Sequence, residues 1–227
     1  MPHRTRAHKR TEEVEHARLP REHEGRFVPP HPRSTVPHIE ISNDHPGIRG
    51  LMFQRPDAAA PLNHLANVLL RAPASLSRGE RELIAAYVSH LNDTPFCAGT
   101  HGAAAAAQLD GGHEAVTAVF AAPQDAPVSP RMRALLAVAA EVMAAARPVG
   151  DETVAAARAA GAEDSDIHDT VLIAAAFCMY NRYVSCLATG IPTQDDYYQQ
   201  AADRIVTDGY ATASGQNGTR ADEALTG

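Results

Sequence analysis

The chain of 227 residues suits one domain with flanking segments or two small domains, and it carries a formal net charge of −7 at pH 7. This charge argues against a general nucleic-acid-binding protein, and no apolar run is long enough to span a bilayer. The sequence is rich in alanine, contains no tryptophan and has only 5% aromatic residues, which favours packed helices over sheets. No secretory signal is visible at the N-terminus, and three irregularly spaced cysteines do not make a disulfide framework. We therefore expect a cytoplasmic protein.

Residues 1–45 are rich in Arg, His, Glu and Pro and show almost no apolar periodicity. Such a segment cannot bury enough surface to offset the entropy lost on ordering, so we expect a disordered arm. Seven of the 12 histidines lie in it and suggest a metal-binding tail as an alternative: His3, His8, His16, His23, His31, His38 and His45. Their long, irregular spacing and the lack of accompanying cysteines favour a solvated arm without a metal.

Residues 46–206 are expected to form a compact all-α domain of six or seven core helices, because apolar residues recur at intervals of three and four between helix stop signals. Turn signals over residues 43–57 predict a loop. Helical patterns cover residues 61–71, 77–91, 95–109, 113–121, 129–147, 151–160, 165–189 and 193–206. The pattern over 165–189 is apolar on nearly every side, which is typical of a core helix. Residues 207–227 have the composition of a disordered tail.

The stretch from Glu82 to His101 carries the candidate chemistry. Asn92 and Asp93 end one helix, and Thr94–Pro95 predicts the start of the next, with Thr94 as N-cap and the proline as first helical residue. Cys97 is then the third helical residue, where the positive end of the helix dipole would stabilise a thiolate and lower the pKa of the thiol. His101 lies one turn further along the same face. If the two helices face each other, Glu82 joins them, which gives a nucleophile, a base and an orienting carboxylate.

This stretch resembles the alkylhydroperoxidase D (AhpD)-like and carboxymuconolactone decarboxylase family, particularly its peroxidase-related members. The family pattern is Glu, eleven residues, Cys, two residues, Cys, three residues and His. The same spacing is found here, but Thr94 stands at the position of the first cysteine. Some of the peroxidases carry a histidine just before the second cysteine of the pattern, and Phe96 stands at that position here.

Two further features extend the resemblance to about residues 60–190. The segment from Ser89 to Asn92 is similar to the Ser-x-x-Asn lead-in of the peroxidase-related group, and Asn181–Arg182 is similar to a pair in a late helix of the family. The resemblance implies an all-α fold and a homo-oligomer.

For the activity, the resemblance implies a thiol-dependent peroxidase in which Cys97 reduces a hydroperoxide with acid–base support from Glu82 and His101. Neither a cofactor nor a metal is expected. Because the first cysteine of the family pattern is missing, an external thiol donor is expected to restore the oxidised sulfur. Cys178 and Cys186 could serve instead, although free cysteines more often act as small apolar filler.

Two other functions stay open. A carboxymuconolactone decarboxylase-type lyase would use Glu82 and His101 for proton transfer on a carboxylactone, without redox chemistry and with Cys97 as a bystander. The third alternative is a non-catalytic oligomer that binds a partner through its arms. No interaction with nucleic acid or membrane is expected.

Overall fold

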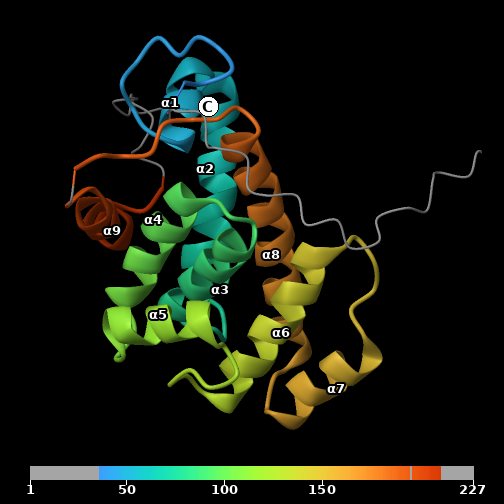
Figure 1. Cartoon of the computed structure of the whole chain (residues 1–227). Helices are drawn as coiled ribbons and strands as arrows, with labels where there is room; N and C mark the ends of the chain where they lie inside the picture. Colours follow the sequence, from blue (N-terminus) through green and yellow to red (C-terminus); the bar gives the residue numbers. More distant parts are fainter. Residues whose placement is uncertain (1–35, 195, 211–227) are drawn as a thin grey trace, which may run out of the picture. The chain divides into compact units, whose positions relative to one another are not determined.

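The computed structural model describes residues 36–194 and 196–210, and this part of the chain contains nine α-helices and no strand (Figure 1). The all-α class predicted from the sequence is confirmed. The helices are α1 (Ile48–Gln54), α2 (Pro56–Arg71), α3 (Arg78–Leu91), α4 (Pro95–Ala106), α5 (Gly112–Ala121), α6 (Pro130–Ala144), α7 (Asp151–Ala159), α8 (Asp164–Ser185) and α9 (Tyr197–Asp208).

The stretch 43–57, which we expected to be a loop, contains all of α1 and the start of α2. Pro56 opens α2 as its first residue, and the neighbouring Arg55 and Asp57 form an ion pair with a 2.9 Å separation. Pro61, predicted as the first helical residue, lies inside α2 instead. A proline there removes one backbone hydrogen bond, and in a helix of 16 residues the rest of the ladder remains.

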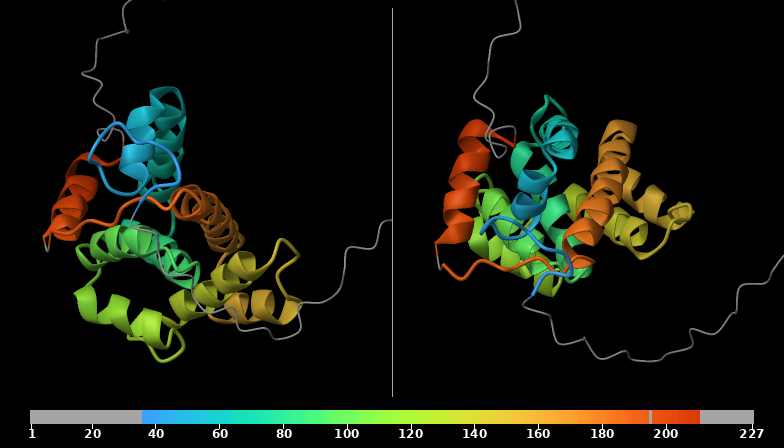
Figure 2. Two further views of the ribbon diagram at one scale, coloured as in Figure 1. Left: turned by 45° about the horizontal axis from the view of Figure 1, so that its top comes forward. Right: turned by 90° about the horizontal axis from the view of Figure 1, so that it is seen from above.

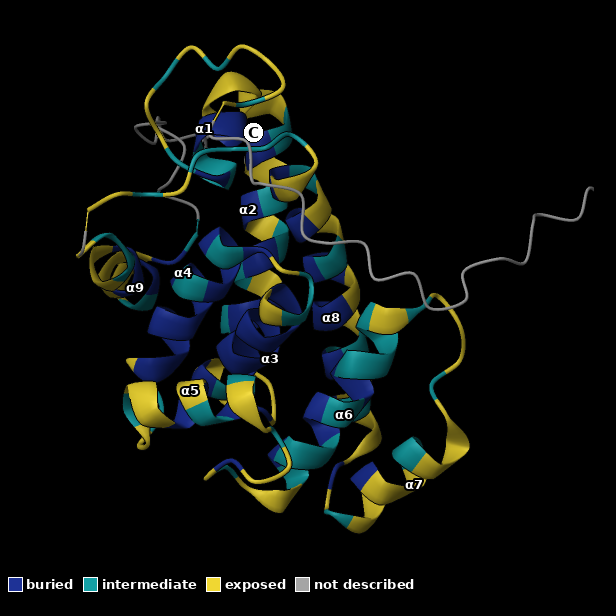
Figure 3. Ribbon diagram, viewed as in Figure 1, coloured by how far each residue is buried: buried dark blue, intermediate teal, exposed yellow. Residues whose placement is uncertain are grey.

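The hairpin of α3 and α4 lies at the centre of the described domain, with α8 and α6 packed against α3 and with α9 packed along α4 (Figures 1 and 2). Leu83, Ile84 and Val88 of α3 are fully buried. Figure 3 shows α3 and α4 almost wholly in the buried colour, whereas α7 at the edge is largely exposed. The hairpin that carries the candidate site is therefore the most enclosed part of the fold.

The alanine-rich part of α4 receives α9. Ala103 and Ala104 pack against Ala202 of α9, and an added Cβ at Gly99 would lie 2.7 Å from the ring of Tyr198. Small side chains on α4 thus allow a close approach of the two helices. The packing brings the end of α9 next to the site.

The helix predicted over residues 165–189 is shorter and less buried than expected. It ends at Ser185, and Leu172 and Met179 are 42% and 44% exposed. They lie seven residues apart, and so on one face, while the opposite face packs on α3 and α6. Although the sequence of α8 is apolar on nearly every side, one face of the helix is therefore left exposed by this chain.

Both ends of the described part extend beyond the limits of 46 and 206 expected for the domain. His38 bonds through its backbone N–H to the carbonyl of Leu187 at 3.0 Å, and its ring Nδ1 lies 3.2 Å from the carbonyl of Cys186. The C-terminal end continues from α9 to Tyr210. The remainder of the expected arm and tail, residues 1–35 and 211–227, lies outside the described residues. Within the described ranges no helix is both long enough and apolar enough to cross a membrane.

Candidate active site

A side-chain cap at the start of α3 and a tight turn before α4 define the hairpin that carries the site. Ser77 and Glu80 form a reciprocal capping box at the start of α3, with N–H to side-chain oxygen distances of 2.8 and 3.2 Å. Thr94 occupies the N-cap position of α4, as predicted, but its side chain does not cap the helix. Its hydroxyl bonds instead to the carbonyl of Asn92 at 3.3 Å and to the hydroxyl of Ser185 at 3.0 Å.

The structure brings Glu82 of α3 and His101 of α4 together. Oε2 of Glu82 lies 2.8 Å from Nδ1 of His101, and the glutamate is only 1% exposed. An ionised carboxylate accepts hydrogen bonds only, so Nδ1 carries the proton of the neutral imidazole in this pair. The lone pair of the ring is then on Nε2, and His101 is set up as a base.

Tyr210 is a third member of this cluster that sequence reasoning missed. Its hydroxyl donates to Oε1 of Glu82 at 2.5 Å and lies 3.3 Å from Nδ1 of His101. Burial, followed by the charge of Glu82, raises the pKa of the Tyr210 phenol well above its usual value. Both carboxylate oxygens of Glu82 are thus occupied, which holds the glutamate and the imidazole in one geometry.

A tight turn at Gly209 positions Tyr210 beside Glu82 and His101. Gly209 has φ of 81°, and a Cβ there would lie 2.6 Å from Oδ1 of Asn67, so only glycine fits. The same Oδ1 accepts the backbone N–H of Tyr210 at 3.0 Å. The sequence around Tyr210 has a polar composition that predicted a tail, and only the α9 packing reveals its role.

A cavity of about 150 Å³, here called the inner cavity, lies beside this cluster. Its walls come from α1, α2, α4, α8 and α9. It is lined by Ile48, Arg49, Met52, Asn63, Phe96, Cys97, Thr100, His101, Phe177, Tyr180, Tyr197, Ala201, Arg204, Ile205, Gly209 and Tyr210. Among the described residues no group of three or more His, Cys, Asp or Glu is arranged to hold a metal ion.

Cys97 lines the inner cavity together with His101, but its thiol does not have the lowered pKa that we expected. The residue is 3% exposed, and burial raises the pKa of the thiol from 9.0 to about 12, although a hydrogen bond with Asn181 lowers it in part. A helix N-terminus typically contributes about 0.3–1 kcal/mol. Three pKa units correspond to about 4 kcal/mol, so the loss of hydration outweighs the dipole. Cys97 is a protonated thiol at rest.

A polar network connects the turn between α3 and α4 to the cysteine. Asn92 donates to Oδ1 of Asn181 at 3.0 Å, and Nδ2 of Asn181 donates to the hydroxyl of Ser89 at 3.0 Å. The Ser89 hydroxyl in turn donates to the carbonyl of Ala85 at 2.8 Å. These bonds fix the amide that faces Cys97. The residues that carried part of the family resemblance therefore share one structural task.

Neither of the other two cysteines lines the inner cavity. Cys178 is half-buried and lies 3.7 Å from Nδ2 of Asn92, and Cys186 is exposed at the end of α8. All three cysteines are free. Of the three cysteines, only Cys97 lines the inner cavity together with His101.

The high pKa of Cys97 makes a direct prediction about alkylation. Because burial raises the pKa, the reactive thiolate is scarce at neutral pH and becomes abundant only as the pH approaches about 12. We expect iodoacetamide to label the exposed Cys186 well before Cys97 at neutral pH, and the difference to vanish in denaturant. Peptide mass mapping over time gives the order, and labelling of Cys97 first would contradict the closed environment of its thiol.

Residues 56–141 match the model of the carboxymuconolactone decarboxylase family. The fold is similar to that of an uncharacterized peroxidase-related protein from Silicibacter sp. TM1040, with a TM-score of 0.61 and 28% sequence identity over 69% of this chain and 80% of that one. The fold is also similar to that of an alkylhydroperoxidase AhpD core, an uncharacterized peroxidase-related protein from Ralstonia eutropha JMP134, with a TM-score of 0.62. The sequence identity is 24%, and the match covers 76% of this chain and 98% of that one. No curated protein matches the chain significantly. The chain is therefore similar to the AhpD-like carboxymuconolactone decarboxylase family, and its fold is similar to that of peroxidase-related proteins.

Proposed function

We propose that the protein is a thiol-dependent peroxidase that reduces hydroperoxides at Cys97 with acid–base support from Glu82 and His101. The observation that carries this proposal is that Cys97 and His101 line one cavity while Glu82 holds Nδ1 of the imidazole at 2.8 Å. A base that is oriented by a carboxylate and placed beside a thiol is the arrangement that activates a nucleophile.

The proposed reaction starts from the neutral thiol. As Sγ of Cys97 attacks the terminal oxygen of the hydroperoxide, the thiol proton moves to Nε2 of His101. The O–O bond breaks, an S–O bond forms, and the alkoxide that leaves takes the proton back from the imidazolium. The products are an alcohol and the sulfenic acid of Cys97. Because the pKa of the thiol is raised to about 12, this proton transfer must accompany the attack.

Recovery of the thiol needs a partner. In the family pattern the partner is the first cysteine, and its position is occupied by Thr94. We propose that an external thiol condenses with the sulfenic acid and releases water, and that a second thiol then releases Cys97 and a disulfide. A reducing cytoplasm would supply such thiols, so we retain the cytoplasm as the proposed location.

Substitution of Thr94 by cysteine tests this account of recovery. We expect the new thiol to form a disulfide with Cys97 after one turnover and to make a dithiol more effective than a monothiol as donor. The hydroxyl of Thr94 does not cap α4, so the variant loses its bonds to Asn92 and Ser185 rather than a cap. Intact mass after one equivalent of hydroperoxide shows the loss of two hydrogens, and Thr94→Ser is the matched control. A Thr94→Cys protein that still accumulates the sulfenic acid would refute the missing-partner explanation.

A lyase of the carboxymuconolactone decarboxylase type is the second candidate. It is favoured by the buried Glu82 and His101 pair, which is complete without sulfur chemistry, and by the protonated resting state of Cys97. The same imidazole would then exchange a proton with a carboxylactone. Carbon dioxide release from a carboxylactone, unaffected by Cys97→Ser, would select this function over the peroxidase.

A further inference from the structure

We propose that the inner cavity binds a small organic anion, a carboxylate on a compact apolar body, and that Arg49 and Arg204 hold its charge. The proposal rests on the proposed function only for the reacting group. If the protein is the peroxidase proposed above, its substrate class is an organic hydroperoxide that carries a carboxylate, with the hydroperoxide group at Cys97.

The charges that line the inner cavity all have one sign. Two of its 16 lining residues are arginines, and none is Asp or Glu. Glu82 does not line the cavity, and its two carboxylate oxygens are bonded to the lining residues Tyr210 (Oε1) and His101 (Oε2). A carboxylate in the cavity would therefore meet cations without a competing carboxylate.

Both arginines are available to a ligand. Within the described part of the chain neither the half-buried Arg49 nor the exposed Arg204 makes a side-chain hydrogen bond or an ion pair. Most other arginines in the described part of the chain have side-chain partners; Arg81, for example, donates to the carbonyl of Leu69 at 3.1 Å. A guanidinium without a partner at the wall of a cavity is suited to carboxylate recognition.

Three other lining residues also have unused hydrogen-bonding capacity. Four buried side-chain polar atoms lack a partner in the described part of the chain, and three of them belong to the inner cavity: Asn63 Nδ2, Thr100 Oγ1 and the Tyr197 hydroxyl. Buried polar groups in native proteins are nearly always satisfied, so such a cluster points to a ligand or water that completes it. The amide and the two hydroxyls can all donate to a carboxylate.

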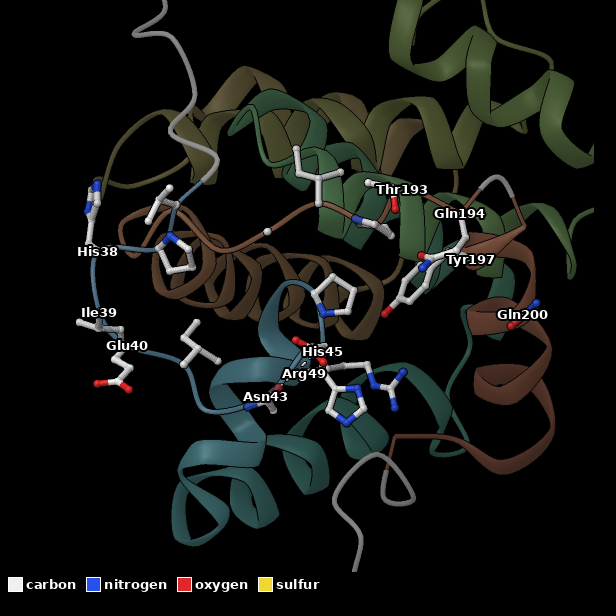
Figure 4. A pocket seen from close by; sticks show the side chains of 18 of the residues that line it. His38, Ile39, Glu40, Asn43, His45, Arg49, Thr193, Gln194, Tyr197 and Gln200 are labelled. Atoms are coloured by element: carbon white, nitrogen blue, oxygen red, sulfur yellow. Dashed lines mark hydrogen bonds between the residues drawn. The ribbon is translucent and has the colours of Figure 1, made fainter.

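A second, larger cavity adjoins the first and shares two of its lining residues. This outer cavity of about 900 Å³ lies between residues 36–49 and 190–200 and shares Arg49 and Tyr197 with the inner cavity (Figure 4). The outer cavity contains acids as well as cations, Glu40 and Asp196 among them. A lining that has cations but no acids, and so favours a negatively charged ligand, is therefore a property of the inner cavity and not of the outer one.

The volume limits the size of the anion. A cavity of about 150 Å³ with apolar walls accommodates a molecule the size of benzene. Phe96, Phe177 and Ile205 supply apolar walls here. Benzoate, which joins such a body to one carboxylate, is therefore a suitable non-reacting probe, and benzamide is its neutral counterpart.

The test is calorimetric titration of the full-length protein with benzoate and with benzamide. We expect saturable binding of benzoate and binding of benzamide weaker by about tenfold or more, the effect of losing a charge-assisted bond. Arg49→Gln and Arg204→Gln should each weaken benzoate by about tenfold and leave benzamide unchanged, which also shows that the cavity is intact. Arg147→Gln is the matched control, because this exposed arginine lines neither cavity.

Equal affinity for the two probes, no saturation by benzoate, or equal effects of the three arginine substitutions would overturn the proposal. The titration involves no turnover, so its outcome is separate from that of the peroxidase assay. Binding of benzoate in this way without consumption of hydroperoxide would support the anion site and refute the proposed peroxidase function. Consumption of hydroperoxide without selective binding of benzoate would refute only the anion site.

Discussion

Substitution of Cys97 by serine is expected to abolish hydroperoxide consumption, because no other thiol lines the inner cavity and a serine hydroxyl cannot form a sulfenic acid. The measurement is the loss of an organic hydroperoxide with a dithiol as donor. Cys186→Ser is the matched control, since Cys186 is exposed at the end of α8 and should not affect the rate.

The same variant separates the two candidate enzymes. A lyase that uses only Glu82 and His101 would lose nothing when Cys97 becomes serine. Hydroperoxide consumption that continues unchanged in Cys97→Ser would exclude the thiol mechanism, and carbon dioxide release from a carboxylactone in that variant would then identify the lyase.

Removal of the acid–base pair is expected to have the second large effect. Glu82→Gln and His101→Ala should each lower the rate of hydroperoxide reduction by roughly 10²–10⁴, the usual range for a lost acid–base group. His101→Ala removes the base itself. Glu82→Gln keeps the size of the side chain but lacks the carboxylate that bonds to Nδ1 at 2.8 Å. Steady-state rates across pH provide the measurement, and a His101→Ala rate equal to that of the parent protein would contradict the proposed base.

Tyr210→Phe belongs to the same series and should have a smaller effect. It removes one donor to Glu82 and leaves the His101 contact in place. We expect about a tenfold loss, the effect of one hydrogen bond to a charged group. A change in the pH dependence of the rate would distinguish this role from simple packing, and thermal unfolding of each variant controls for loss of the fold.

The sequence predicted the parts of the site that depend on local chemistry. The helix start at Thr94–Pro95 was predicted from the sequence, and the spacing along two helices places Glu82 opposite His101 once the helices face each other, as they do in the structure. The family resemblance pointed to Asn181, but not to its hydrogen bonds with Ser89 and Asn92.

The missing parts depend on packing between distant segments. Tyr210 reaches Glu82 across 128 residues, after the Gly209 turn, and nothing in a polar C-terminal sequence indicates that contact. Arg49 lies in a stretch that turn signals assigned to a loop. The raised pKa of Cys97 follows from its burial, and burial is set by α1, α8 and α9 together rather than by position on α4.

The most direct test of the peroxidase proposal is mass mapping of the protein after one equivalent of organic hydroperoxide in the presence of dimedone, which traps sulfenic acids. We expect a dimedone adduct on Cys97, none on Cys178 or Cys186, and a strongly reduced yield in His101→Ala. Hydroperoxide consumption without an adduct on Cys97, or with the adduct on Cys186 instead, would contradict the proposal.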